Sequence, residues 1–137
     1  MRIGFTCGAF DLLHAGHVVM LKEAKANCDY LIVGLQTNPN LDRKQKNIPI
    51  QSIYERFTQL SAIKYVDELL VYDTEASLLD LLESTPIDIR FVGDDYKGKN
   101  FTGKGIGKTF YTNRKHSFST TSLRERIKEE KNDTSNN

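Results

Sequence analysis

Two histidines three residues apart, His14 and His17, have the residue type and the spacing that most directly indicate chemistry in this chain. They lie where an apolar run over residues 3–7 gives way to a helical pattern that begins near Gly16. A helix N-terminus carries unpaired backbone N–H groups and the positive end of the helix dipole, and both attract phosphate. We therefore predict a phosphate-binding site at this junction, with the imidazoles as additional hydrogen-bond donors.

Two other interpretations of the histidine pair have to be weighed against phosphate binding. The pair could be structural, or it could bind zinc, but a zinc site takes about four ligands and the one further histidine is His116. Gly8 and Gly16 flank the pair, and glycine lets a chain turn tightly and approach a ligand closely. Phosphate binding is therefore the interpretation that we favour.

Charged side chains in two later segments are also candidates for ligand binding. The polar loop 37–51 carries Lys44 and Lys46, which could close over a triphosphate, although two loop lysines can equally be solvated. Asp94 directly follows an apolar run over residues 89–93. A carboxylate at such a strand end could hydrogen-bond a ribose or a base, or simply belong to a turn.

A cluster of hydroxyl groups stands at the start of the last helical pattern. Ser119, Thr120 and Thr121 could cap the free N–H groups of that helix, and the same groups could hold phosphates. Arg114 lies five residues before the cluster and would add positive charge. This segment is a second candidate for phosphate binding.

The apolar runs predict the elements that must position these side chains. Five strands are predicted, at residues 3–7, 30–35, 66–72, 89–93 and 109–112. Helices are predicted between and after them, at residues 16–27, 52–63, 74–84 and 120–130. This alternation implies a single α/β, Rossmann-like, doubly wound domain with a five-stranded parallel sheet. Ligands of such sheets bind outside the carboxyl ends of the strands, where the histidine pair and Asp94 fall.

The composition is that of an ordinary soluble domain, and it excludes some classes of function. Nineteen basic and 18 acidic side chains nearly cancel, so there is no basic excess for binding nucleic acid. No apolar run approaches the roughly 20 residues that cross a membrane, and a secretory signal is absent, so we expect a cytoplasmic protein. Residues 1–130 are expected to form the domain and residues 131–137 a disordered polar tail.

The motifs, taken in order, resemble the His-x-Gly-His signature of the nucleotidyltransferase superfamily. The resemblance runs from residue 3 to residue 127, through the histidine motif at 8–17, Gly-Asp-Asp at 93–95 and the Ser-Thr-Thr after Arg114. Within the superfamily the chain is most similar to the cytidylyltransferases, above all to glycerol-3-phosphate cytidylyltransferase. The resemblance implies transfer of CMP from CTP to a small phosphorylated alcohol, which gives a CDP-alcohol and pyrophosphate.

The resemblance also assigns roles to individual residues. Its catalytic set is His14, His17, Lys44 and Arg114. Its nucleotide-binding set is Gly8, Ala9, Phe10, Gly16, Lys46, Asp94, Ser119, Thr120 and Thr121. Its acceptor-binding set is Asp11, Arg56, Lys64 and Asp67. It further implies Mg²⁺ bound with the triphosphate, and a homodimer.

All four acceptor-binding assignments have a structural alternative or a departure from the family. Asp11 could instead cap a turn, and Arg56 and Asp67 could instead form structural ion pairs. Lys64 stands where relatives have an arginine, and lysine cannot make the bidentate fork of a guanidinium. Ala15 also replaces a tryptophan of the glycerol-3-phosphate enzymes. These departures concern the acceptor and not the triphosphate.

Other functions therefore stay open. The acceptor could be another alcohol phosphate, such as phosphoethanolamine or phosphocholine. The enzyme could instead be an adenylyltransferase that acts on a sugar phosphate, pantetheine phosphate or FMN, although the segment from Arg114 to Thr121 favours cytidine. A nucleotide-binding regulator without catalysis is the alternative of another class, and the intact histidine pair argues against it.

Overall fold

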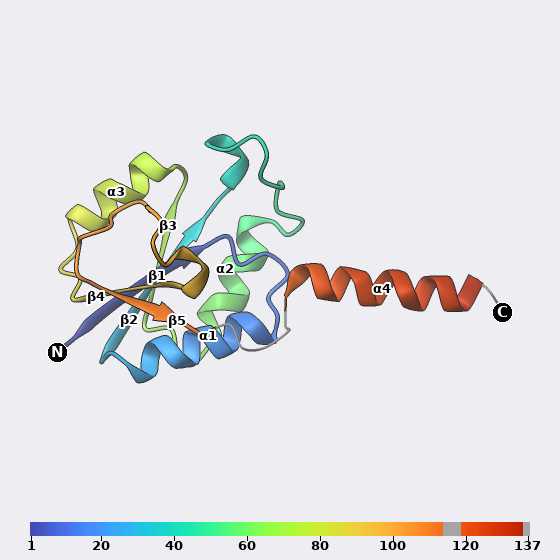
Figure 1. The fold of residues 1–137 in the computed structure, drawn as a ribbon, viewed down its shortest axis with the longest axis horizontal. Coiled ribbons are helices and arrows are strands. Elements are labelled where there is room, and N and C mark those ends of the chain that lie inside the picture. The colour runs from blue at the N-terminus through green and yellow to red at the C-terminus, as the bar shows by residue number, and fades with distance from the viewer. Residues whose placement is uncertain (114–118, 136–137) are drawn as a thin grey trace.

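The computed structural model describes residues 1–113 and 119–135, with the backbone alone described at 120 and 131–135. Its centre is a sheet of five parallel strands in the order β3-β2-β1-β4-β5, shown in Figure 1. The strands are β1 (Ile3–Gly8), β2 (Tyr30–Gln36), β3 (Glu68–Tyr72), β4 (Ile89–Gly93) and β5 (Lys108–Thr112). The predicted five-stranded parallel sheet is confirmed.

Helices cover both faces of the sheet. They are α1 (Ala15–Ala26), α2 (Ile53–Ser61), α3 (Glu75–Glu83) and α4 (Thr120–Ser135), with short 3-10 turns at η1 (Pro39–Leu41) and η2 (Asp94–Tyr96). Leu21 of α1 and Leu60 of α2 belong to one apolar core, whereas Leu78 and Leu82 of α3 belong to another. The two cores lie on opposite faces, so the sheet is doubly wound, as the alternation of strands and helices predicted.

Local sequence signals account for how these elements begin. The Ser52 hydroxyl accepts a hydrogen bond from the Glu55 N–H at 3.1 Å, and the Glu55 carboxylate accepts one from the Ser52 N–H at 3.0 Å. This reciprocal capping box at the start of α2 is the one that the sequence predicts. Strand β2 is buried from Leu31 onward, which fits its continuous apolar run and its place between two covered faces.

Two element ends differ from the sequence prediction. Strand β3 begins at Glu68 and not at residue 66, because the Val66 N–H donates to the Ile63 carbonyl in a turn. Helix α4 continues to Ser135, beyond the predicted helix end at residue 130, and no proline or glycine interrupts it.

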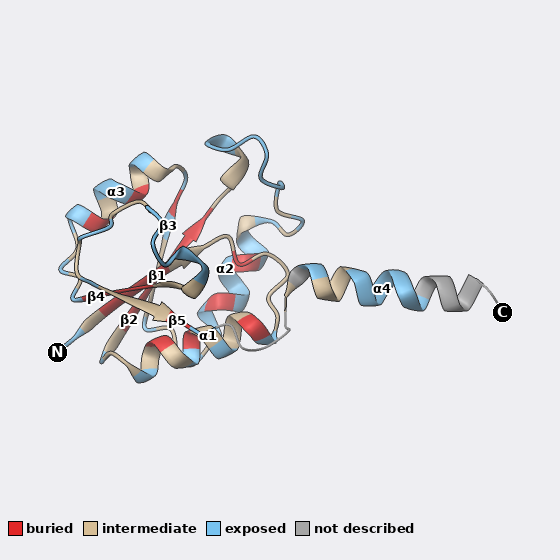
Figure 2. Ribbon diagram, in the orientation of Figure 1, coloured by how far each residue is buried: buried red, intermediate tan, exposed pale blue. Residues whose placement is uncertain are grey.

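Helix α4 extends away from the rest of the chain in Figure 1, and residues 125–130 are exposed in Figure 2. Its sequence over this stretch is mostly charged, which suits a helix surrounded by water. No helix in the described part of the chain is long and apolar enough to cross a membrane.

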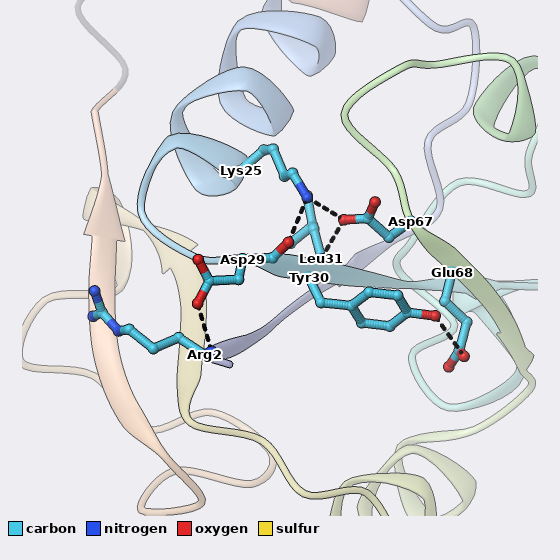
Figure 3. A network of polar contacts seen from close by, with 7 residues as sticks. All are labelled: Arg2, Lys25, Asp29, Tyr30, Leu31, Asp67 and Glu68. Carbon is cyan, nitrogen blue, oxygen red and sulfur yellow. Dashed lines mark hydrogen bonds and ion pairs between the residues drawn. The ribbon is translucent and has the colours of Figure 1, made fainter.

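A polar network ties the amino ends of the strands together, as Figure 3 shows. The Asp67 carboxylate accepts hydrogen bonds from the Leu31 N–H at 2.7 Å and from Lys25 Nζ at 2.5 Å. Lys25 Nζ also donates to the Asp29 carbonyl at 2.7 Å. Partial burial raises the pKa of Asp67, but the hydrogen bonds from Lys25 and Leu31 outweigh it and hold that pKa below its ordinary value.

The Asp67→Asn variant is expected to be less stable than the parent at neutral pH and equally stable in strong acid. A carboxylate whose pKa falls on folding stabilises the fold above its unfolded pKa of about 3.9, and that stabilisation disappears as pH falls through the folded pKa. Because the Asp67 side chain is 28% exposed, the expected difference is about 1 kcal/mol. Urea unfolding at neutral pH and near pH 2 measures it, and a difference that persists in acid would contradict this account.

Candidate active site

A cleft of about 670 Å³ opens at the carboxyl edge of the sheet, where ligands of doubly wound folds bind. Its walls come from the segment between β1 and α1, the loop after β2, the first turn of α3, the loop after β4 and the first turns of α4. The predicted site residues that line it are Gly8, Ala9, Phe10, Asp11, His14, Gly16, His17, Lys46 and Thr121. The structure therefore brings the histidine motif, one loop lysine and the start of the last helix around one cavity.

The two histidines form the N-terminal cap of α1 with their own side chains. Nδ1 of His14 accepts a hydrogen bond from the Gly16 N–H at 3.0 Å, and Nδ1 of His17 accepts one from the His14 N–H at 3.2 Å. This reciprocal pair is a capping box built from imidazoles, where serine or threonine with glutamate is usual. The two rings stack with their centroids 3.9 Å apart.

These cap contacts assign the tautomer of both rings. A ring nitrogen that accepts a hydrogen bond carries no proton, so the proton of each neutral imidazole lies on Nε2. Both His14 and His17 therefore offer an Nε2–H donor from the side of the ring turned from the cap. The junction combines these donors with the positive end of the helix dipole, which is an arrangement that binds phosphate.

The turn before α1 is made by two residues other than glycine. Phe10 and Leu12 have φ angles of 48° and 51°, in the left-handed region that side chains other than glycine rarely adopt. The expectation that Gly8 supplies the tight turn is wrong, because its φ is not positive and an added Cβ would only touch the Phe10 ring at 3.4 Å. Strained backbone of this kind is often found at functional sites, where surrounding contacts hold it in place.

Asp11 lines the cleft, and its carboxylate also holds the backbone of the polar loop. Its two oxygens accept hydrogen bonds from the backbone N–H groups of Ile50 and Gln51, each at 2.9 Å. The Gln51 side chain returns a contact by accepting from the Leu12 N–H at 2.8 Å. Asp11 therefore fixes the end of the polar loop against the histidine motif, which is the turn-capping alternative that the sequence left open.

Arg56, which the resemblance assigns to acceptor binding, is buried and does not line the cleft. Its side chain is 2% exposed, and its N–H groups donate at 2.6 to 3.1 Å to backbone carbonyls. Those carbonyls belong to Ala9, Gln36, Thr37 and Gln51. Burial lowers the pKa of Arg56, and the nearby charge of Asp11 raises it. The guanidinium is therefore an internal clamp that joins the histidine motif, the end of β2 and the start of α2.

Of the two predicted loop lysines, Lys46 lines the cleft and Lys44 does not. The Asn40 side chain holds the loop by donating to the backbone carbonyls of both lysines at 2.8 Å. Arg43, which the sequence analysis did not single out, lines the cleft from the same loop. This loop therefore contributes two cationic side chains to the cleft, Arg43 and Lys46.

Of the two aspartates after β4, the one that reaches the cleft is not the predicted one. The chain enters η2 directly after β4, and this turn brings Asp95 to the cleft while Asp94 stays outside it. The Asp94 carbonyl accepts the Lys97 N–H at 3.2 Å within that turn. Asp95, and not the predicted Asp94, therefore lines the cleft.

The start of α4 meets the prediction in part. Ser119 Oγ accepts a hydrogen bond from the Ser122 N–H at 2.9 Å, which is a capping contact, and Ser119 does not line the cleft. Thr121 does line it. The Thr120 side chain and the whole of Arg114 lie outside the described residues.

Lys64 and Asp67, both predicted to bind the acceptor, lie at the amino edge of the sheet and not at the cleft. Both precede β3, whose carboxyl end is at the cleft, and Asp67 is held by Lys25 and Leu31. Lys64 Nζ lies over the Tyr65 ring, 5.3 Å from its centroid. Neither of these two predicted residues therefore lines the cleft.

The sequence analysis missed a polar group on the α3 side of the cleft. It consists of Cys7, Tyr72, Glu75 and Arg90, all of which line the cavity. Burial raises the pKa of the Cys7 thiol and of the Tyr72 hydroxyl, so both are neutral at pH 7. Arg90 is a charged residue within the otherwise apolar strand β4, and that position was the signal that could have revealed it. Among the described side chains, no group of three potential metal ligands is present.

The fold and the site together define a class of enzyme. A histidine-capped helix N-terminus at the carboxyl edge of a parallel sheet, faced by a cationic loop, suits binding of a nucleoside triphosphate and transfer of its nucleotidyl group. Residues 5–126 match the model of the cytidylyltransferase-like family. The chain belongs to this family, and it is a nucleotidyltransferase in class.

Named relatives refine the comparison. The chain is 37% identical over 129 residues to the bifunctional protein HldE of Caulobacter vibrioides. The matched stretch covers 90% of this chain and 26% of that protein. It is 40% identical over 108 residues to HldE of Wolinella succinogenes, and this match covers 78% of this chain and 23% of that protein. The chain thus spans about a quarter of the length of these curated relatives. The finer resemblance to glycerol-3-phosphate cytidylyltransferase is not confirmed.

Solved structures show the same architecture. The lipopolysaccharide core biosynthesis protein from Thermoplasma volcanium matches with a TM-score of 0.61 at 25% identity, covering 94% of this chain and 88% of that one. Pantoate-beta-alanine ligase from Francisella tularensis matches with a TM-score of 0.61 at 18% identity, covering 90% of this chain and 65% of that one, and shows a shared fold alone.

Proposed function

We propose that this chain transfers AMP from ATP to a sugar phosphate, forming an ADP-sugar and releasing pyrophosphate. The observation that supports nucleotidyl transfer best is the pair of histidines that caps α1 and lines the cleft. Similarity to the HldE proteins supports adenine and a sugar phosphate over CTP and glycerol 3-phosphate, with a heptose phosphate as the first acceptor to test. The likeness to a lipopolysaccharide core biosynthesis protein also favours a saccharide substrate.

The proposed reaction is a displacement at phosphorus. An oxygen of the sugar phosphate attacks the α-phosphorus of ATP, and the bond from that phosphorus to the pyrophosphate oxygen breaks. Charge then builds on the departing pyrophosphate, so donors positioned beforehand lower the barrier. The Nε2–H groups of His14 and His17 donate to these phosphate oxygens, and Arg43 and Lys46 neutralise charge from the loop. In this proposal Arg114 adds further positive charge, and Mg²⁺ enters bound to the triphosphate.

A pyrophosphate-release assay tests this function directly. ATP and CTP are compared with Mg²⁺ against a heptose phosphate, other sugar phosphates, glycerol 3-phosphate and phosphocholine. We expect turnover with ATP and a sugar phosphate. Turnover with CTP and an alcohol phosphate would replace the proposal by cytidylyl transfer, which the Ser119–Thr121 segment favours, and binding of nucleotide without any turnover would indicate a regulator.

Replacement of Lys46, which lines the cleft, is expected to weaken triphosphate binding more than replacement of Lys44. Lys46→Ala should raise the KM for the nucleotide by about 10-fold, since one charge-assisted contact to phosphate disappears. Lys44→Ala should have the smaller effect, because Lys44 does not line the cleft. Steady-state kinetics of both variants measure this, and a larger effect at Lys44 would show that the loop closes in a different arrangement.

A further inference from the structure

Arg90 on β4 is a buried cation that reaches the cleft. It is 4% exposed, yet it lines the cavity. Its Nη1 donates to the Thr102 carbonyl at 2.9 Å, and its Nη2 lies 3.4 Å from Cys7 Sγ. The guanidinium also lies over two aromatic rings, 5.5 Å from the centroid of Phe5 and 5.4 Å from that of Phe101.

The partners of Arg90 are weak for a buried charge. The one ion pair found among the described residues joins Lys25 and Asp67, so no described carboxylate neutralises the Arg90 guanidinium at short range. Its Nε has no hydrogen-bond partner in the described part of the chain. A buried charge without a counter-ion or full hydrogen bonding is costly, and such a group is often kept for a ligand.

The side chains around Arg90 offer both donors and acceptors to the same side of the cleft. Tyr72 is 5% exposed and keeps its phenolic proton, because burial raises its pKa. Glu75 lies in the first turn of α3 and acts electrostatically on both Cys7 and Tyr72. Phe101 adds an apolar ring to the cleft beside the Arg90 guanidinium. A ligand with several neutral hydroxyl groups matches this mixture, since each hydroxyl both donates and accepts.

The loop after β4 holds this part of the cleft in shape. Gly103 has a φ of +79°, and an added Cβ there would clash with Leu82 Cδ1 and lie 3.2 Å from Arg90 Nη1. The loop therefore lies directly against α3 and against the guanidinium, with Phe101 and Thr102 beside it. Close packing of this kind fixes the direction of Arg90 before a ligand arrives.

We infer that Arg90, together with Tyr72 and Glu75, selects the acceptor by binding hydroxyl groups of its carbon chain. The inference rests on the proposed function and deepens it, because it assigns the acceptor's specificity to side chains that the family resemblance did not single out. Arg90 donates to hydroxyl oxygens, Glu75 accepts from hydroxyl protons, and Tyr72 can do both. The acceptor is then a polyhydroxylated sugar phosphate, whereas a short alcohol phosphate leaves these groups unpaired.

Kinetics with acceptors of different hydroxyl content test this inference. For Arg90→Leu we expect the KM for the sugar phosphate to rise about 10-fold or more, with partial recovery in Arg90→Lys. The KM for ATP and the kcat/KM for glycerol 3-phosphate should change by less than about 2-fold. Lys104→Gln is the matched control, because Lys104 Nζ lies 5.8 Å from the Phe101 centroid but Lys104 does not line the cleft. This control should behave as the parent with every substrate.

The other outcomes show whether the proposed function or the role of Arg90 is wrong. If the parent enzyme turns over no sugar phosphate, the proposed function fails and this inference fails with it. If it does, but Arg90→Leu loses activity equally with both acceptors or raises the KM for ATP, Arg90 is structural and this inference alone is wrong. Tyr72→Phe keeps the ring and removes the hydroxyl, so it provides the same comparison if Arg90→Leu does not fold, with an expected rise of about 3-fold or more in the sugar-phosphate KM.

Discussion

Replacement of His17 by alanine is expected to lower turnover at least about 100-fold, the scale for losing one preorganised donor to charge that develops in a transition state. The His17 Nε2–H is assigned to this role because its Nδ1 is occupied by the His14 N–H at 3.2 Å. The same substitution opens the capping box of α1 and costs about 1 kcal/mol of stability. Pyrophosphate release at saturating substrates, with a melting curve for each protein, measures both effects.

Two further variants separate catalysis from capping. His17→Gln keeps a side-chain acceptor at the third helical position, where glutamine also completes capping boxes, but it removes the imidazole. It should therefore retain the parent's stability and still lose turnover. Glu55→Ala opens the capping box of α2 outside the cleft and should lower stability with turnover unchanged. Turnover within about 10-fold of the parent in folded His17→Gln would show that the imidazole is not the transition-state donor.

The fold could be predicted from the sequence because its signals are local. Near-continuous apolar runs such as residues 89–93 mark strands covered on both faces, and this run agrees with β4 at both ends. Ser52 followed by Glu55 marks a helix start by the hydrogen bonds that these two side chains make with each other's backbone. The element ends that were predicted less accurately, such as the start of β3, depend on turns that composition describes poorly.

The candidate site was predictable in its motifs but not in the direction of single side chains. Adjacent residues in the turn after β4 face different ways, so Asp95 and not Asp94 reaches the cleft. Lys46 likewise lines the cleft and Lys44 does not, although both lie in one loop. Arg90 is brought to Cys7 by packing between residues 83 positions apart, and no local pattern records such a contact. Motif resemblance locates the cleft, and tertiary packing decides which member of each pair faces it.

The Arg56→Met variant is expected to lose at least about 3 kcal/mol of stability, because buried carbonyls lose their donor and each such loss costs about 1 to 3 kcal/mol. The guanidinium donates to carbonyls in three segments, including those of Ala9 and Gln36 at 2.9 and 2.6 Å. Methionine fills part of the volume but can donate no hydrogen bond. The expected fall in Tm is about 10 °C or more for a domain of this size, and differential scanning calorimetry measures it.

Arg43→Met is the matched control for this clamp. Arg43 carries the same charge in the neighbouring loop, but it is exposed and lines the cleft. Its replacement should leave stability within about 0.5 kcal/mol of the parent and raise the KM for the nucleotide. If Arg56→Met instead melts as the parent does and raises only the KM for the acceptor, then Arg56 contacts substrate and the clamp is a secondary feature. A large loss of stability with a general loss of activity supports the clamp, because the histidine motif would then no longer be anchored to α2.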